Sequence, residues 1–235
     1  GKSGLVKRNV PQTNNWYAHG VLADINNNGS GEIYWTTDRD KMICYDYLSN
    51  SILWGPITYP TNLGDNISIT DFDGDGVPEI YDNRYIINAA TGVLMGEFPA
   101  GLSVISQRQV AVDVLPDNYC QDCDGLEIVI GTDVLSVDIV AGVAYIKVAS
   151  SLKNDGLSQY YSPIGSRHST IADLDGDGML DVATVSEDML FIWNPRTLQV
   201  MKSIYINTLP VPFSVSYCLF PPVIEDIDND NDLDF

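Results

Sequence analysis

Residues 69–80, ITDFDGDGVPEI, place four carboxylates within nine positions and then run into an apolar stretch. The acidic side chains are Asp71, Asp73, Asp75 and Glu79. Two like charges about 4 Å apart repel by roughly 4 kcal/mol at an effective dielectric constant near 20. Such crowding requires a compensating charge, and the rest of the sequence indicates which one.

The acidic pattern returns along the chain. Related segments lie at 21–33, 171–182 and 224–235, and a stretched version lies at 110–129. The leading aspartates are Asp24, Asp71, Asp113, Asp173 and Asp226, at intervals of 47, 42, 60 and 53 residues. This interval is typical of one four-stranded blade of a β-propeller.

Each acidic segment leads into short runs rich in β-branched and aromatic residues, which are separated by Gly, Asn or Pro. Every unit therefore reads as four short strands, with the acidic loop between the first and second. A sheet of this size cannot bury both of its faces alone, so neighbouring units must stack. We predict an all-β fold: a β-propeller of four-stranded blades.

The repeat gives the predicted division of the chain. The blades are expected at 17–62, 63–103, 104–162 and 163–215, a fifth begins at 216–235, and 1–16 forms an outer strand of another blade. The fifth unit reaches Phe235 as its second strand should begin. We therefore expect an incomplete fragment of a longer chain.

Composition narrows the choice of partners. The formal net charge is −20, which disfavours nucleic acid and anionic membrane surfaces because both bind basic faces. The sequence has no apolar run of about 18 residues, so we expect no direct membrane insertion in this segment. Cations are the natural partners of such a chain.

The loop chemistry indicates calcium. Counted from the leading aspartate, oxygen-bearing side chains occupy positions 1, 3, 5 and 9, and position 6 is Gly29, Gly76 or Gly178 in three loops. Alternate side chains converge when the backbone curls, and glycine tolerates the bend. Calcium binds six to eight oxygens, including a backbone carbonyl such as that of position 7. We predict about four structural Ca²⁺ ions.

Four loops have assignable ligands. They are Asp24, Asn26, Asn28, the Ser30 carbonyl and Glu32; Asp71, Asp73, Asp75, the Val77 carbonyl and Glu79; Asp173, Asp175, Asp177, the Met179 carbonyl and Asp181; and Asp226, Asp228, Asp230, the Asp232 carbonyl and Asp234. The second and fourth loops carry the strongest signal, whereas the first has fewer carboxylates and should bind more weakly.

The third loop carries six extra residues and has Leu115 at position 3. Its candidate ligands are Asp113, Asp122, Asp124 and Glu127. They have no definite assignment.

Two other interpretations compete with these sites. An EF-hand needs a glutamate at position 12 and flanking helices. Position 12 is Trp35, Asp82 or Thr184, and strand-forming residues follow, so the EF-hand is excluded. A polar turn without metal is the simpler alternative, but four loops in one register argue against it.

The repeated D-x-D-x-D-G-x-x-[DE] loop followed by an apolar strand resembles the FG-GAP and VCBS repeats. These occur in integrin α-subunit propellers and in large bacterial surface proteins. The resemblance implies a calcium-stabilised β-propeller at the cell surface or outside the cell, used for cell adhesion or for binding a protein or carbohydrate ligand. Ligand identity does not follow from the fold.

An enzyme is the alternative function. His19, Asn66, Arg108 and His168 occupy equivalent places near the first strands, which would make them candidates for a ligand channel. The alternative is a catalytic or non-catalytic propeller of a carbohydrate-active enzyme such as a polysaccharide lyase. Catalysis needs an acid and a base within reach of one bond, and no such pair can be assigned, so we favour a non-enzymatic module.

Cys120 and Cys123 have the spacing of a redox motif or half a zinc site. No second pair and no following helix support either. We favour a local disulfide in the third loop over free thiols.

Overall fold

The computed structural model describes residues 20–63, 66–82, 84–102, 108–152, 167–186, 189–205 and 222–226. These residues form sixteen β-strands in four antiparallel sheets, and no α-helix occurs among them. The prediction of an all-β chain with four-stranded units is confirmed. No helix in this part of the chain is long and apolar enough to cross a bilayer.

Each sheet uses four consecutive strands in chain order. The first sheet contains β1 (Gly20–Ala23), β2 (Glu32–Asp38), β3 (Lys41–Asp46) and β4 (Ser51–Thr58). The second contains β5 (Ser68–Thr70), β6 (Glu79–Tyr81), β7 (Tyr85–Asn88) and β8 (Leu94–Glu97). The third contains β9 (Val110–Val112), β10 (Glu127–Ile130), β11 (Asp133–Val140) and β12 (Val143–Ser151). The fourth contains β13 (Arg167–Ala172), β14 (Asp181–Ser186), β15 (Met189–Trp193) and β16 (Val200–Tyr205).

The inner strands of the second and third sheets are apolar on both faces because each of these sheets packs between two neighbours. On β6, Ile80 joins the core shared with the first sheet, whereas the next residue, Tyr81, joins the core shared with the third. Ile87 and Ile86 on β7 divide in the same way. Successive side chains of a strand point to opposite faces, so continuous apolar runs are expected here.

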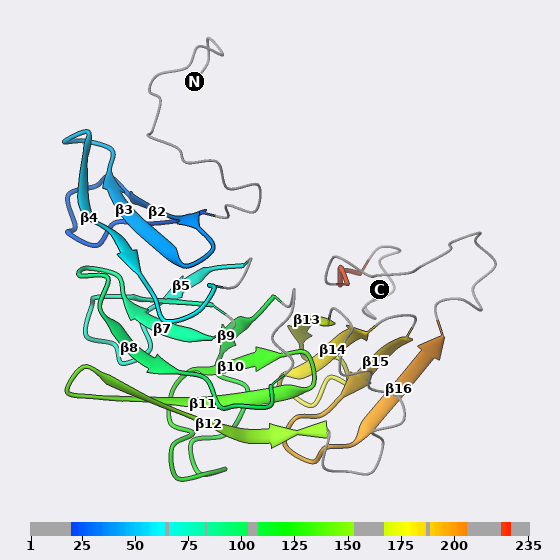
Figure 1. The fold of residues 1–235 in the computed structure, drawn as a ribbon. Helices are drawn as coiled ribbons and strands as arrows, with labels where there is room; N and C mark the ends of the chain where they lie inside the picture. The colour runs from blue at the N-terminus through cyan, green and yellow to red at the C-terminus, as the bar shows by residue number, and fades with distance from the viewer. Residues whose placement is uncertain are drawn as a thin grey trace.

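The sheets follow one another along a curve, with β5, β9 and β13 on its inner side (Figure 1). Specific contacts link neighbours: the Trp54 indole N–H donates to the Ala89 carbonyl at 2.9 Å, and Arg108 forms a parallel bridge with His168. The predicted stacking of units is therefore present. The closed blade arrangement of a propeller remains a prediction.

Candidate metal centre

The strand register places the last acidic residue of each loop at the same point. In every sheet it begins the second strand and pairs with the last residue of the first strand. These pairs are Ala23 with Glu32, Thr70 with Glu79, Val112 with Glu127, and Ala172 with Asp181. The acid that closes each loop is therefore held by the sheet itself.

The loops of the first, second and fourth sheets share one backbone shape. Each leading aspartate accepts a hydrogen bond from the N–H of the position 6 glycine: Asp24 from Gly29 at 2.7 Å, Asp71 from Gly76 at 3.0 Å and Asp173 from Gly178 at 2.9 Å. These glycines have φ values of 82°, 89° and 85°, in the left-handed region. A side chain there would be strained, which explains glycine at this bend.

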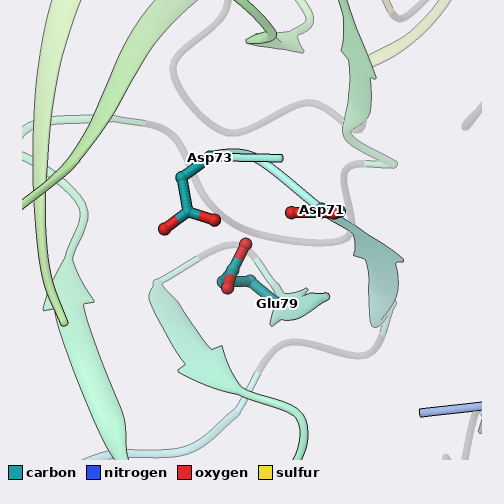
Figure 2. Close-up of side chains that lie close together, drawn as sticks. All are labelled: Asp71, Asp73 and Glu79. Carbon is teal, nitrogen blue, oxygen red and sulfur yellow. The ribbon is translucent and has the colours of Figure 1, made fainter. Parts of the chain in front are cut away.

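The second loop brings three carboxylates together. Asp71, Asp73 and Glu79 each offer an oxygen within 4.8 Å of the other two, and the side chains point toward one another (Figure 2). Glu79 is 1% exposed, and its Oε2 accepts the Phe72 N–H at 3.0 Å. The Oδ1 atom of Asp71 is buried and receives no hydrogen bond within the described part of the chain. An unpaired buried carboxylate oxygen is costly without a counter-charge.

Burial raises the pKa of Glu79 to about 7, and the charges of Asp73, Asp71 and Asp75 add to this rise. The Phe72 N–H opposes the shift. The cluster therefore resists carrying its full negative charge.

The donor set fits a hard divalent cation. The converging atoms are carboxylate oxygens, and calcium and magnesium prefer oxygen ligands. A bound cation would compensate both the like-charge repulsion and the unpaired Asp71 oxygen.

The fourth loop is similar but includes a basic side chain. Asp173, Asp175 and Asp177 form its cluster, with one oxygen each within 4.8 Å of the others. Asp181 is fully buried, and burial raises its pKa. The guanidinium of Arg196 lies close to Asp177 and Asp181. Its Nη2 is 3.4 Å from Asp177 Oδ2 and 3.7 Å from Asp181 Oδ1.

The first loop satisfies part of its own polarity. The Asn26 side-chain amide donates to Glu32 Oε1 at 2.9 Å, and the Ile25 N–H donates to Glu32 Oε2 at 2.9 Å. The Asn28 side-chain oxygen accepts the Ser30 N–H at 2.8 Å. An amide thus supplies a donor where the second loop has a carboxylate. Weaker calcium binding by the first loop remains a prediction.

The third loop differs most from the others. Glu127 is 1% exposed and its Oε2 accepts the N–H groups of Val114 and Leu115, at 3.0 and 3.1 Å. Burial raises the pKa of Glu127 to about 7. Leu115 is 1% exposed and belongs to an apolar core, so its side chain leaves position 3 without a ligand.

Among the described residues, no group of three acidic side chains that could hold a metal ion occurs at this loop. Asp122 is paired with Lys147, and Asp124 is exposed. Cys120 and Cys123 form the expected local disulfide.

The remaining predicted residues fall into two groups. His19 and the fifth-loop residues Asp228, Asp230, Asp232 and Asp234 lie outside the described residues, and Asp226 lies in the short segment 222–226. Among the channel candidates, Arg108 is exposed and His168 is 2% exposed on β13, with no hydrogen bond to either ring nitrogen. Burial and the Arg108 charge lower the pKa of His168. A ligand channel lined by these residues remains a prediction.

A cavity of about 510 Å³ lies where the third and fourth loops meet. Asp113, Asp117 and Asn118 line one side, and Met179 lines the other. Drug-sized ligand sites have volumes in this range.

Sequence reasoning missed Arg196 as a member of the fourth loop. It lies in the turn between β15 and β16, well beyond the acidic motif, and its spacing from that motif carries no signal. Comparing the turns that follow the third strands could have identified Arg196. Where such a turn begins with an asparagine or aspartate, only the turn of the fourth sheet has a basic residue two positions later.

No protein-family model matches the chain, and a search of curated proteins finds no match. Three solved structures match part of the chain. The V. cholerae biofilm matrix protein Bap1 matches 81% of this chain at 17% identity and a TM-score of 0.42. An Agrocybe aegerita lectin that recognises non-reducing terminal N-acetylglucosamine matches 80% at 16% identity and 0.43. BamB from Moraxella catarrhalis matches 76% at 12% identity and 0.35. The chain covers 39%, 52% and 50% of these structures, respectively.

Proposed function

We propose that this chain is a calcium-binding β-propeller module that binds a protein or carbohydrate ligand outside the cell, with calcium in a structural role. The observation that carries the calcium site is the cluster of Asp71, Asp73 and Glu79, in which a buried Asp71 oxygen has no hydrogen-bond partner among the described residues. The proposed ion would join the end of β5 to the start of β6.

Two further features support the setting. The Cys120–Cys123 disulfide is compatible with an oxidising compartment, because structural disulfides persist there. Millimolar calcium outside the cell can fill sites with dissociation constants of roughly 10⁻⁴ to 10⁻³ M. We therefore propose an extracellular or surface-displayed protein related to the FG-GAP and VCBS repeats.

The calcium proposal is tested by thermal unfolding of the metal-stripped chain during titration with calcium chloride. The melting temperature should rise with calcium and saturate, because a ligand that binds only the folded state stabilises it. Magnesium should give a smaller rise, since it demands tighter octahedral geometry. A melting curve that excess calcium leaves unchanged would contradict the proposal.

The ligand proposal assigns the cavity between the third and fourth loops. Asp117 and Asn118 are exposed at this cavity and offer a hydrogen-bond acceptor and an amide to a ligand. The chain should retain a polysaccharide or matrix protein in a binding assay, and Asp117→Asn with Asn118→Ala should weaken retention. Incubation with alginate and hyaluronan distinguishes the enzyme alternative: new unsaturated chain ends would show a lyase, whereas binding without cleavage supports a non-enzymatic module.

A further inference from the structure

The second and fourth acidic loops have the same backbone pattern but different surroundings. In the fourth, Arg196 is 12% exposed by its side chain and points its guanidinium between two acids of the loop. Its Nη1 donates to the Leu180 carbonyl at 2.9 Å. The cluster of the second loop consists of Asp71, Asp73 and Glu79 and has no corresponding cation among its described contacts.

The turns that follow the third strands of these two sheets are directly comparable. Each turn begins with an asparagine whose backbone makes two hydrogen bonds. The Asn88 N–H donates to the Val93 carbonyl at 2.9 Å, and the Asn88 carbonyl accepts the Gly92 N–H at 2.8 Å. In the fourth sheet, the Asn194 N–H donates to the Gln199 carbonyl at 2.9 Å, and the Asn194 carbonyl accepts the Leu198 N–H at 2.9 Å. Arg196 therefore corresponds to Ala90, which is exposed.

The same comparison explains why the arginine is held in place. In the second sheet the Ala89 N–H donates to the carbonyl of Pro78, the eighth residue of the acidic loop, at 3.1 Å. The corresponding residue in the fourth sheet is Pro195, which has no N–H. The carbonyl at the eighth position, Leu180, takes its hydrogen bond from Arg196 instead. The guanidinium is thus anchored to the loop by a bond that the backbone cannot supply.

We propose that Arg196 is an internal counter-ion that weakens calcium binding at the fourth loop, so that the second loop is the tighter site and fills first. The inference rests on the proposed calcium function. A cation entering the fourth loop meets the positive charge of Arg196, which already offsets part of the charge of Asp177 and Asp181. Asp181 Oδ1, like Asp71 Oδ1 in the second loop, is buried and accepts no hydrogen bond from the described residues, but it lies 3.7 Å from the Arg196 guanidinium. A cation entering the second loop meets an unpaired buried oxygen. The fourth sheet then keeps its loop ordered at calcium concentrations that leave the second loop empty.

The test is calorimetric titration of the metal-stripped 235-residue chain with calcium chloride, combined with substitutions that assign each site. Asp73→Asn should remove the tightest binding event, whereas Asp175→Asn should leave it in place. Arg196→Gln should tighten the fourth site by about tenfold or more, because the competing charge is lost while a donor to Leu180 remains. Arg84→Gln is the matched control: it removes one positive charge at the turn after β6, at the other end of that strand from the acidic loop, and should change neither site.

A graft tests the idea independently of the stability of the fourth sheet. Ala89→Pro with Ala90→Arg removes the N–H that occupies the Pro78 carbonyl and places the same side chain at the corresponding turn, so it should weaken the tightest site about tenfold. Ala89→Pro with Ala90→Gln should not. If Arg196→Gln unfolds the chain, the graft still decides the outcome.

The possible results separate the two proposals. No calcium binding at any site would overturn the proposed function itself. Loss of the tightest event in Asp175→Asn, or unchanged affinities in both Arg196→Gln and the graft, would overturn the role of Arg196 while leaving the calcium sites intact.

Discussion

At the scale of single residues, Glu79 combines full burial with three neighbouring acids, so its effect on stability should depend on calcium. Glu79→Gln removes a ligand and also removes repulsion from the empty site. A hundredfold loss of calcium affinity corresponds to about 2.7 kcal/mol. In saturating calcium the melting temperature should fall by roughly 5–10 °C. In metal-stripped protein it should stay constant or rise.

The control for this substitution is Glu97→Gln, which makes the same chemical change at an exposed position on β8. It should leave both melting temperatures within about 2 °C of the original, because exposed charges contribute little to stability. Equal destabilisation of the loaded and stripped forms by Glu79→Gln would show that the side chain is structural rather than a calcium ligand.

The raised pKa of Glu79 also predicts the pH dependence of the metal-stripped protein. Its pKa of about 7 in the folded state lies above the ordinary value of 4.5, so the folded state binds more protons between these pH values. The free energy of unfolding therefore falls as pH rises from 4.5 to 7. Glu127 acts in the same direction, whereas the lowered pKa of His168 acts in the opposite direction below about pH 6.5. Denaturant titrations of the original chain and Glu79→Gln isolate the contribution of Glu79, and identical pH slopes would contradict it.

At the scale of the element, the acidic loops and the strands around them were predictable because each is specified by residues only a few positions apart in the sequence. Alternating oxygens at fixed spacing and apolar runs after each loop are local patterns, and local patterns determine a hairpin with a curled connection. The Arg196 contact was not predictable from the loop motif, since it depends on how the turn after β15 folds back. The burial of Leu115 was not predictable either, because its side chain packs in a core shared with the fourth sheet, and residues of another sheet do not appear in a local sequence pattern.

The third loop has a covalent link, whereas the second and fourth loops have converging carboxylate oxygens. Cys120→Ser with Cys123→Ser should destabilise the chain by about 2 kcal/mol, the chain-entropy value for so short a closed loop. The melting temperature should fall by roughly 4–8 °C, and by the same amount with and without calcium. Thermal unfolding in both conditions checks this. A loss seen only in the calcium-loaded protein would mean that the disulfide shapes a metal site after all.

At the scale of the whole molecule, stability should depend on the layers between sheets, because the sheets join through side chains rather than through shared strands. Separate apolar cores link the first sheet to the second, the second to the third and the third to the fourth. In such an array each sheet is stabilised by its neighbours. A local defect in one layer should therefore weaken the two sheets beside it most.

Gly96 provides a test of one such layer. It lies on β8, and a Cβ atom there would stand 2.5 Å from the Ala144 carbonyl oxygen on β12 of the next sheet. Gly96→Ala should force the second and third sheets apart and cost about 1–3 kcal/mol, the usual range for overpacking. Gly31→Ala is the matched control, since its added Cβ would meet neighbours only at 3.8 Å or more, and it should be nearly neutral. Hydrogen exchange should show faster exchange in β8 and β12 of Gly96→Ala while β15 stays protected. Equal loss of protection in all four sheets would instead mean that they unfold as one cooperative unit, in which no layer acts separately.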